Sequence, residues 1–351
     1  MTMVSRAPAH WISDQDARTR TVGRDSVIDT TRGIAILMVI AIHSLPQPLD
    51  ASWQKLIDAA LRPCVPIFLF ASGYLTALSG KVALWKRVKA ALIPYAIAFF
   101  AAYIYMALHN AAMDHRVTTA AARFIFAYVF VYYYVFVYIG CTLGLWLIFQ
   151  IAERNSSHSQ GRLVVLLSLS IVVGLIAGSY IDPLLARVGI SDSVVQEVRL
   201  RDIPFWFSFV ALGALVGLFT SGSELRNMRL ILAASALAAY SIYAAVRIFG
   251  VGDAADYDST AFFGYASLLC VLLLVVRPRL PFLATIGSGS YFIYLWHIFP
   301  VMALRDHTSL RAFGPISDFA ATYTATAIVS VGALLAVRRI APSHFSRWLG
   351  A

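Results

Sequence analysis

Three ionisable side chains interrupt an apolar segment near the start of the chain. Asp29 and Arg32 precede a run of apolar residues that begins after Gly33, and His43 lies at the far end of that run. Ionisable groups inside a membrane span are costly, and they normally face the interior of a helix bundle or a water-filled cavity and serve function. Because imidazole titrates near neutral pH, His43 could take the proton of a hydroxyl group.

The spacing of these residues suits one shared cavity. Arg32 and His43 lie three helical turns apart, so they occupy nearly the same face and are separated by about 16 Å along the axis. Asp29 precedes Arg32 by three residues, a spacing that permits an ion pair and lowers the cost of burying the guanidinium. Alternatively, Arg32 extends to the lipid headgroups and His43 marks the outer membrane boundary. The shared face favours the cavity.

The composition predicts an integral membrane protein. The 351 residues are 60% hydrophobic and only 13% charged, with a mean hydropathy of +0.74. Since a transmembrane helix needs about 20 apolar residues, we expect an all-α polytopic protein with about ten transmembrane helices. We predict a polar tail at 1–24 and a single domain at 25–351, with spans near 27–45, 61–80, 90–110, 132–153, 163–181, 203–221, 229–249, 259–277, 284–304 and 316–337.

The net charge of +10 is better explained by membrane orientation than by nucleic-acid binding. Lys and Arg residues alternate between successive loops, which a nucleic-acid footprint would not require. If both termini are cytoplasmic, the loops on that side, such as 81–89, hold most of the basic residues, whereas the opposite loops, which include 182–202 and 250–258, together hold most of the acidic ones. This distribution satisfies the positive-inside rule and predicts a multi-pass inner-membrane protein with both termini in the cytoplasm.

Three further stretches accompany the first segment. They are the stretch 66–75 with Ser72-Gly73-Tyr74, the basic run Lys86-Arg87-Val88-Lys89 before Pro94-Tyr95, and the stretch 287–297 with Tyr291 and His297. Together with Arg32 and His43, which are separated by ten residues, this ordered set resembles the acyltransferase-3 family. Members of that family are ten-helix bacterial membrane proteins that acylate cell-surface sugars and related molecules. One departure is that the family's basic loop often has two arginines three residues apart, whereas Ala90 follows Arg87 here.

The resemblance implies a donor, a receiving substrate and roles for particular residues. The donor would be cytoplasmic acyl-CoA, acetyl-CoA first of all, and the other substrate a hydroxyl of a carbohydrate or glycolipid. No metal and no nucleic acid is expected. His43 would be the general base, and transfer would be direct or through an acyl-histidine. The resemblance assigns catalysis to His43 and Arg32, donor binding to Arg32, Lys86, Arg87 and Lys89, and substrate binding to Asp29, Ser72, Tyr74, Tyr291 and His297.

Simpler interpretations stay open for several of these residues. Lys86, Arg87 and Lys89 could be ordinary positive-inside charges, and Ser72 to Tyr74 could serve close helix packing. Tyr291, Tyr294, Trp296 and His297 could form an aromatic belt at the membrane interface. The same applies to the dense cluster Tyr128, Tyr132, Tyr133, Tyr134 and Tyr138, which could instead bind sugar rings. Arg62 and Arg247 are expected to pair with acids such as Asp58 or Asp253 and are given no role.

Two other functions compete with acyl transfer. A transporter or flippase for a glycan precursor would also place polar residues inside ten helices, although no second copy of the 29–43 pattern is found in the chain. A non-catalytic partner in an export complex would leave the buried ionisable residues unexplained.

Overall fold

The computed structural model describes residues 25–110, 113–129, 131–153, 159–219, 227–252 and 257–351. Every extended regular element among them is a helix, which confirms the all-α prediction. The predicted tail at 1–24 lies outside the described residues, as do the loop residues Arg154, Arg226, Asp253 and Asp256.

The longer helices are α2 (Ser26–Ser44), α4 (Cys64–Ser79), α5 (Leu84–His109), α7 (Tyr133–Glu153), α8 (Ser159–Arg187), α10 (Ile203–Phe219), α12 (Arg229–Phe249), α13 (Thr260–Val276) and α17 (Pro315–Ile340). The shorter ones are α3 (Ser52–Leu61), α6 (Val117–Ile125), α9 (Asp192–Leu200), α14 (Pro281–Ser288), α15 (Ser290–Trp296), α16 (Ile298–His307) and α18 (Ser343–Leu349). A 3-10 helix covers Leu310–Phe313.

The predicted apolar stretches all correspond to helical segments. Eight described helical stretches are long and apolar enough to cross a membrane, two of them formed by the consecutive pairs α3 with α4 and α9 with α10. Helix α13 is apolar but shorter. The stretch predicted at 284–304 is divided into α14, α15 and α16, with breaks at Gly289 and His297. The fold is therefore that of a polytopic helical membrane protein in which one predicted span is interrupted.

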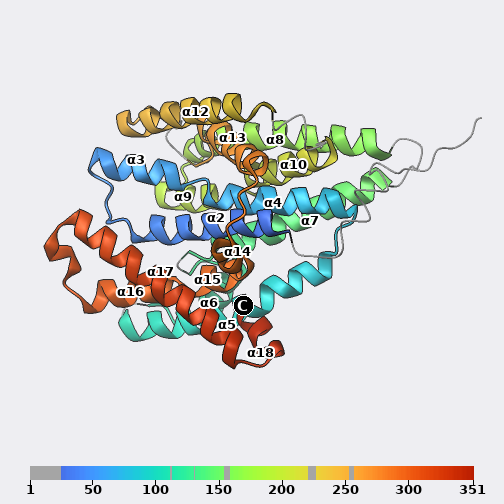
Figure 1. The fold of residues 1–351 in the computed structure, drawn as a ribbon. Coiled ribbons are helices and arrows are strands. Elements are labelled where there is room, and N and C mark those ends of the chain that lie inside the picture. Colours follow the sequence, from blue (N-terminus) through green and yellow to red (C-terminus); the bar gives the residue numbers. More distant parts are fainter. Residues whose placement is uncertain (1–24, 111–112, 130, 154–158, 220–226, 253–256) are drawn as a thin grey trace, which may run out of the picture.

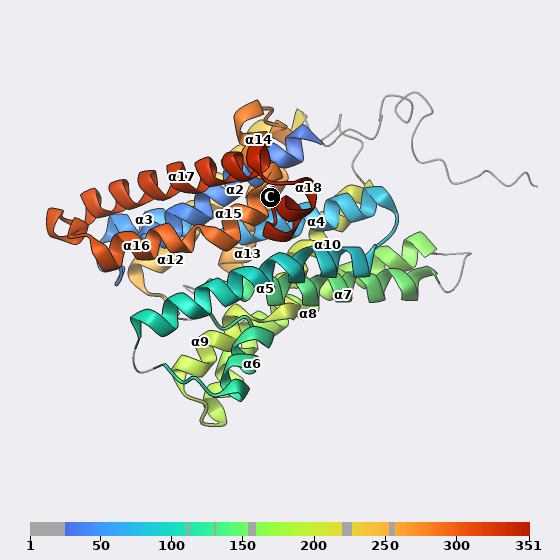
Figure 2. The ribbon, with the colours of Figure 1, turned by 90° about the horizontal axis from the view of Figure 1, so that it is seen from below.

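Helix α2 lies in the middle of the bundle. In Figure 1 it runs between α4 above and α14, α15 and α17 below, and it packs against each of these helices. Seen from below in Figure 2, α5, α7 and α8 form the opposite side of the molecule from α16 and α17. Ala35, Ile36 and Ile40 of α2 have no exposed surface. The helix that carries the predicted site is thus surrounded by protein rather than by lipid.

Both ends of α2 are fixed by polar contacts. At the N-terminus the side chain of Asp25 accepts a 2.9 Å hydrogen bond from the Val27 amide. At the C-terminus Nη2 of Arg305, from α16, donates to the carbonyl oxygens of His43 and Leu45 at 2.8 and 2.9 Å. Since the last carbonyls of a helix have no partner within the helix, this arginine satisfies the segment that carries His43.

Glycines allow α2 and α4 to approach their neighbours backbone to backbone. A Cβ atom on Gly33 would overlap the carbonyl oxygen of Leu283 in α14, and one on Gly287 would overlap the carbonyl oxygen of Asp29. Gly73 and Gly213 relate α4 to α10 in the same way. Small residues at such crossings allow the close packing on which helix association in membranes relies.

We predict that Gly287→Ala lowers the thermal stability of the purified protein, because the added methyl group meets backbone that cannot rotate away. Overpacking of this kind costs about 1–3 kcal/mol. The matched control is Gly332→Ala in α17, where a Cβ atom would have no neighbour within 4 Å. Melting curves in detergent give the measurement, and equal melting temperatures for the two variants would contradict the need for close α2–α14 packing.

Candidate active site

One cavity of about 530 Å³ lies against α2. Its lining includes Arg32 and His43 from α2, Ser72 from α4, Arg87 and Ala90 from α5, Tyr133, Tyr134 and Tyr138 at or in α7, and Ser288, Ser290, Tyr291 and Tyr294 from α14 and α15. Arg32 and His43 are eleven residues apart on one helix, so the cavity extends along α2 for about 16 Å. The shared cavity inferred from the helical spacing is present.

Asp29 and Arg32 form the ion pair that their spacing predicts. Nη1 of Arg32 lies 3.8 Å from Oδ1 of Asp29, whose carboxylate is buried. The Arg32 side chain retains 30% of its exposure and lines the cavity, whereas Asp29 does not line it. Asp29 is therefore positioned to hold the guanidinium, and Arg32 is the member of the pair that a bound molecule could contact.

The basic run at the start of α5 divides into cavity-lining and exposed residues. Arg87 lines the cavity, and its Nη1 atom is buried without a hydrogen-bond partner. Lys86 and Lys89 are exposed and do not line the cavity. Ala90 lines the cavity at the position where the family often has its second arginine. Of this run, Arg87 alone offers a cation to the cavity.

The Ser72-Gly73-Tyr74 element is divided in the same way. Ser72 lines the cavity, whereas Gly73 lies against the carbonyl oxygen of Val210 in α10. Tyr74 does not line the cavity; its carbonyl oxygen and ring edge lie close to Gly217 of α10. Close packing thus accounts for Gly73, and Ser72 is the residue that could touch a bound molecule.

Tyrosine rings form much of the cavity wall. Tyr133, Tyr134 and Tyr138 line it, so these members of the cluster face the protein interior rather than the membrane interface. Tyr291 and Tyr294 line it as well, stacked with their ring planes 14° apart. Their hydroxyls donate to the main-chain oxygens of Ala91 and Val131, at 2.6 and 2.5 Å. The hydroxyls therefore hold the rings in place, and the ring surfaces face the cavity.

His297 lies behind His43 rather than on the cavity surface. Its side chain has no exposed surface, and it is absent from the cavity lining. The two imidazole ring centroids are 5.4 Å apart. From the sequence, His297 was expected to bind substrate. Its position does not favour that role, because a bound molecule would meet His43 first.

The cavity is also lined by an ion pair and a tyrosine that were assigned no role in the sequence analysis. Asp58, Arg62 and Tyr257 line it. Nε of Arg62 donates to Oδ2 of Asp58 at 2.7 Å, and Arg247 pairs with the same oxygen. The Arg62 guanidinium lies 3.4 Å from the centre of the Tyr257 ring, within the range of a cation–π interaction.

The expected pairing of Arg62 and Arg247 with Asp58 is present, but it does not use all of Arg62. Its Nη1 atom is buried without a partner, beside the cavity. The signal in the sequence was the same as for Arg32, an ionisable residue within an apolar stretch. Sequence reasoning missed Arg62 because a nearby acid already offered a sufficient explanation for its burial.

The arrangement places the cations Arg32 and Arg87 and the imidazole of His43 on one cavity. Such a cavity can hold an anionic group near Arg32 and Arg87 while a second group reaches His43. Among the described residues, no group of three or more His, Cys, Asp or Glu side chains is placed to hold a metal ion. The chemistry available from these side chains is proton transfer and electrostatic binding.

Comparison with known proteins agrees with this chemistry. A family model described as an acyltransferase domain matches residues 25–336, nearly the whole chain. No curated protein and no solved structure was found to match. The matched region includes the central α2 with Arg32 and His43, the basic run of α5 and the interrupted segment α14 to α16. The chain belongs to the acyltransferase-3 family, and it is a polytopic membrane acyltransferase.

Proposed function

We propose that this protein transfers an acyl group, acetyl in the first instance, from cytoplasmic acyl-CoA to a hydroxyl of a carbohydrate or glycolipid on the other side of the membrane. The observation that carries the proposal is the single cavity that Arg32, Arg87 and His43 share. A polyanionic donor and a hydroxyl substrate need an anion site and a base that open onto one space.

Arg32 and Arg87 form the donor end of the cavity in this proposal. The phosphates of CoA carry several negative charges, and Arg87 offers a buried Nη1 atom without a partner to receive one of their oxygens. Arg32, held by Asp29, would meet the phosphates or the pantetheine amides. The exposed Lys86 and Lys89 would add long-range attraction without contact.

His43 acts at the other end of the donor. Its unprotonated nitrogen takes the proton of the substrate hydroxyl while that oxygen attacks the thioester carbonyl carbon. The tetrahedral intermediate then expels the CoA thiolate as the carbon–sulfur bond breaks, and the imidazolium returns the proton to sulfur. The products are the ester and free CoA. In the variant in which His43 itself is acylated first, an imidazole nitrogen attacks the thioester carbonyl carbon and CoA leaves. The substrate hydroxyl then attacks the acyl-histidine in a second step, which forms the ester and frees His43.

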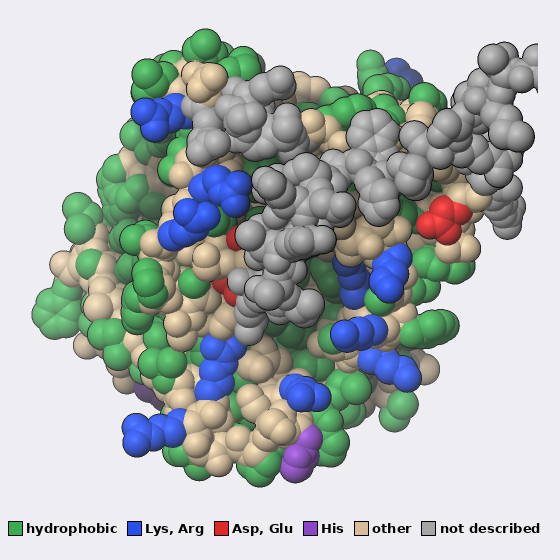
Figure 3. Space-filling model, turned by 45° about the vertical axis from the view of Figure 1, so that its right-hand side comes forward, with side chains coloured by type: hydrophobic (Ala, Val, Ile, Leu, Met, Phe, Trp, Pro, Cys, Tyr) green, Lys and Arg blue, Asp and Glu red, His purple; other side chains and the backbone are tan. Residues whose placement is uncertain are grey.

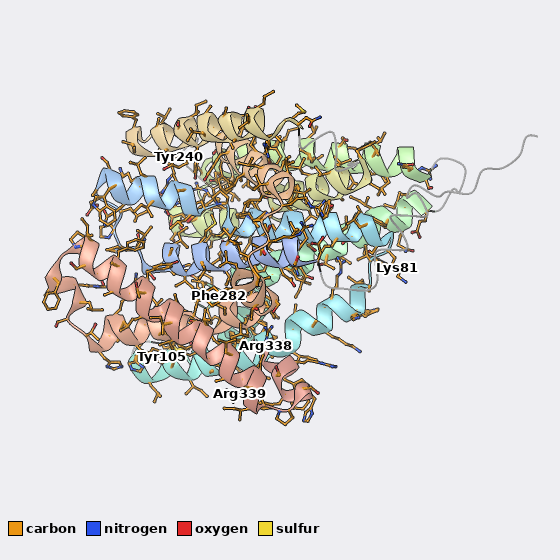
Figure 4. All side chains as sticks on the ribbon, viewed as in Figure 1. Lys81, Tyr105, Tyr240, Phe282, Arg338 and Arg339 are labelled. Atoms are coloured by element: carbon orange, nitrogen blue, oxygen red, sulfur yellow. The ribbon has the colours of Figure 1, made fainter. Side chains whose placement is uncertain are left out.

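We further propose that the protein lies in the bacterial inner membrane with both termini in the cytoplasm. Figure 3 shows Lys and Arg side chains gathered on one face. In Figure 4, Lys81 lies towards one end of the bundle and Tyr105 and Tyr240 towards the other, and Arg338 and Arg339 lie on the Lys81 side of these tyrosines. Positive residues concentrate on the cytoplasmic side of membrane proteins, so the Lys81 end is assigned to the cytoplasm.

The orientation predicts which added cysteines can be labelled from outside. The three native cysteines are buried, so a single cysteine introduced at exposed Ser191 or Lys81 can be followed with a membrane-impermeant maleimide in spheroplasts. We expect Ser191→Cys to react in intact spheroplasts and Lys81→Cys only after permeabilisation. The reverse pattern would contradict the orientation and the donor side assigned with it.

Replacing Arg87 by Ala is expected to raise the KM for acyl-CoA roughly tenfold or more with a smaller effect on kcat. The reason is that a phosphate contact binds ground state and transition state alike, and a charged hydrogen bond contributes about 1.5–3 kcal/mol. Lys86→Ala and Lys89→Ala are the matched controls, since each removes the same charge from the same helical turn without touching the cavity. Equal KM changes for all three variants would show a general charge effect and reject the contact.

Replacing His43 by Gln is expected to lower kcat at least a hundredfold, since general-base catalysis contributes about 10²–10⁴. Glutamine keeps approximate size and hydrogen bonding but cannot take the proton at neutral pH. The assay is ester formation by protein in lipid nanodiscs with acyl-CoA and a sugar, and His43→Ala should behave in the same way. Exposed His344→Gln serves as the control.

The melting temperature of each His43 variant separates lost chemistry from lost folding. A folded His43→Gln protein with near wild-type turnover would remove the base from the proposal. It would also favour the transporter alternative, in which His43 only forms hydrogen bonds with a passing solute.

A further inference from the structure

His297 is held in one tautomer by the last turn of α15. Its Nδ1 atom lies 2.8 Å from the carbonyl oxygen of Tyr294 and 3.1 Å from that of Ile293. A carbonyl oxygen can only accept a hydrogen bond, so Nδ1 carries the hydrogen and donates. The ring is fully buried and no described carboxylate pairs with it, which favours the neutral form with its lone pair on Nε2.

The Nε2 atom of His297 is an unused hydrogen-bond acceptor in the protein interior. It is buried and has no partner in the structure. Buried polar atoms are almost always paired, so an orphan of this kind calls for a function or a partner. The side chain has no exposed surface, so bulk solvent does not reach this atom.

The His43 ring is the neighbouring group within reach. The two centroids are 5.4 Å apart and the ring planes are tilted by 37°. Two imidazoles joined by an N–H···N hydrogen bond have centroids about 5 Å apart, because each nitrogen lies about 1.1 Å from its centroid and the bond is about 3 Å long. The torsion that turns the His43 ring has a broad energy profile, so a small rotation is enough to form the bond.

Arg305 does not compete for this position. Its guanidinium donates to the main-chain oxygens of His43 and Leu45. Arg305 holds the backbone at the end of α2. It does not fix the rotation of the His43 side chain, which needs a contact with the ring itself.

We propose that Nε2 of His297 accepts a hydrogen bond from the His43 N–H that points away from the cavity, and so fixes the tautomer and the ring orientation of the base. The unprotonated nitrogen of His43 then faces the cavity. When His43 takes the hydroxyl proton, the lone pair of His297 stabilises the imidazolium until that proton passes to the CoA thiolate. His297 is thus a positioning residue, and the inference rests on the proposed role of His43.

The interruption of the helix supports this role. His297 ends α15 and precedes α16, and its ring is tied to the last turn of α15 through Nδ1. A ring so held cannot turn without losing its bonds to the carbonyls. A positioning group needs this rigidity, because a base must be held within a narrow range of orientations to act.

The test compares variants that keep one, both or neither of the two hydrogen-bonding positions. In His297→Gln, the donor nitrogen and the acceptor oxygen of the side-chain amide are bonded to one carbon. This resembles imidazole, in which Nδ1 and Nε2 are both bonded to Cε1. His297→Asn is shorter and reaches the carbonyls but not His43, and His297→Phe keeps volume without either position. The readout is kcat and the KM for acyl-CoA in nanodiscs, with melting temperature as the check of folding.

We expect His297→Phe and His297→Asn to lower kcat roughly tenfold or more, as loss of an orienting partner does, with the KM for acyl-CoA nearly unchanged. His297→Gln should recover much of the loss. Equal kcat values for the Gln and Asn variants would overturn the proposal, and this comparison holds even where the Phe variant does not fold. A purely structural role predicts that kcat follows melting temperature across the three variants.

His43→Gln, measured in parallel, separates this inference from the proposed function. If His43→Gln is inactive while folded His297→Asn turns over like wild type, the positioning role fails and the base stands. If His43→Gln turns over like wild type, the proposed function fails, and His297 has no base to position.

Discussion

Gly33 and Gly287 allow α2 and α14 to meet at the level of their backbones. Lipid tails are as apolar as the surfaces of the helices, so the hydrophobic effect does not drive helices together in a membrane. Helix association there depends on close packing and on polar contacts. The close contact places α14 and α15 beside α2, and with them Ser288, Ser290 and Tyr291 on the same cavity as Arg32. Without that approach the cavity would lose one of its walls. The rest of the site takes its position from this crossing.

Arginines then hold the helix ends that such packing exposes. In a membrane every backbone polar group must find a partner within the protein. Arg305 donates to the carbonyls that end α2, and Arg338 from α17 donates to the carbonyl oxygen of Thr285 and to Ser288 Oγ at the end of α14. These residues count as positive charges in an orientation argument, but their contacts show that they also organise the site. The same arginine side chains thus supply charge at a span boundary and support the backbone.

The sequence predicted what depends on local periodicity. Long apolar runs located the spans, and the spacing of Arg32 and His43 placed both on one face because helix geometry is nearly constant. The interruption of 284–304 escaped prediction because its breaks lie at Gly289 and His297, within a run that is apolar throughout. The short helices α3, α6 and α9 were also missed, being too short to register as spans.

The lining of the cavity was harder to predict than its principal residues. Tyr133, Tyr134 and Tyr138 could face either lipid or protein, and only their packing decides between the two. Arg62 and His297 show the same limit. Arg62 lines the cavity although it was given no role, and His297 lies behind His43 although it was expected to bind substrate. A side chain's surroundings depend on residues far away in the chain, and periodicity carries no information about them.

Arg32 and His43 belong to one uninterrupted helix, and this has a consequence for donor choice. Their separation is a property of helical rise, about 1.5 Å per residue, and no loop movement can shorten or lengthen it. For the proposed donor, held at Arg32 and attacked beside His43, α2 sets a fixed distance between the two contacts. In the proposed reaction, a thioester on a shorter arm would reach either Arg32 or His43, but not both together. Selection by length would then come before any recognition of the acyl group itself.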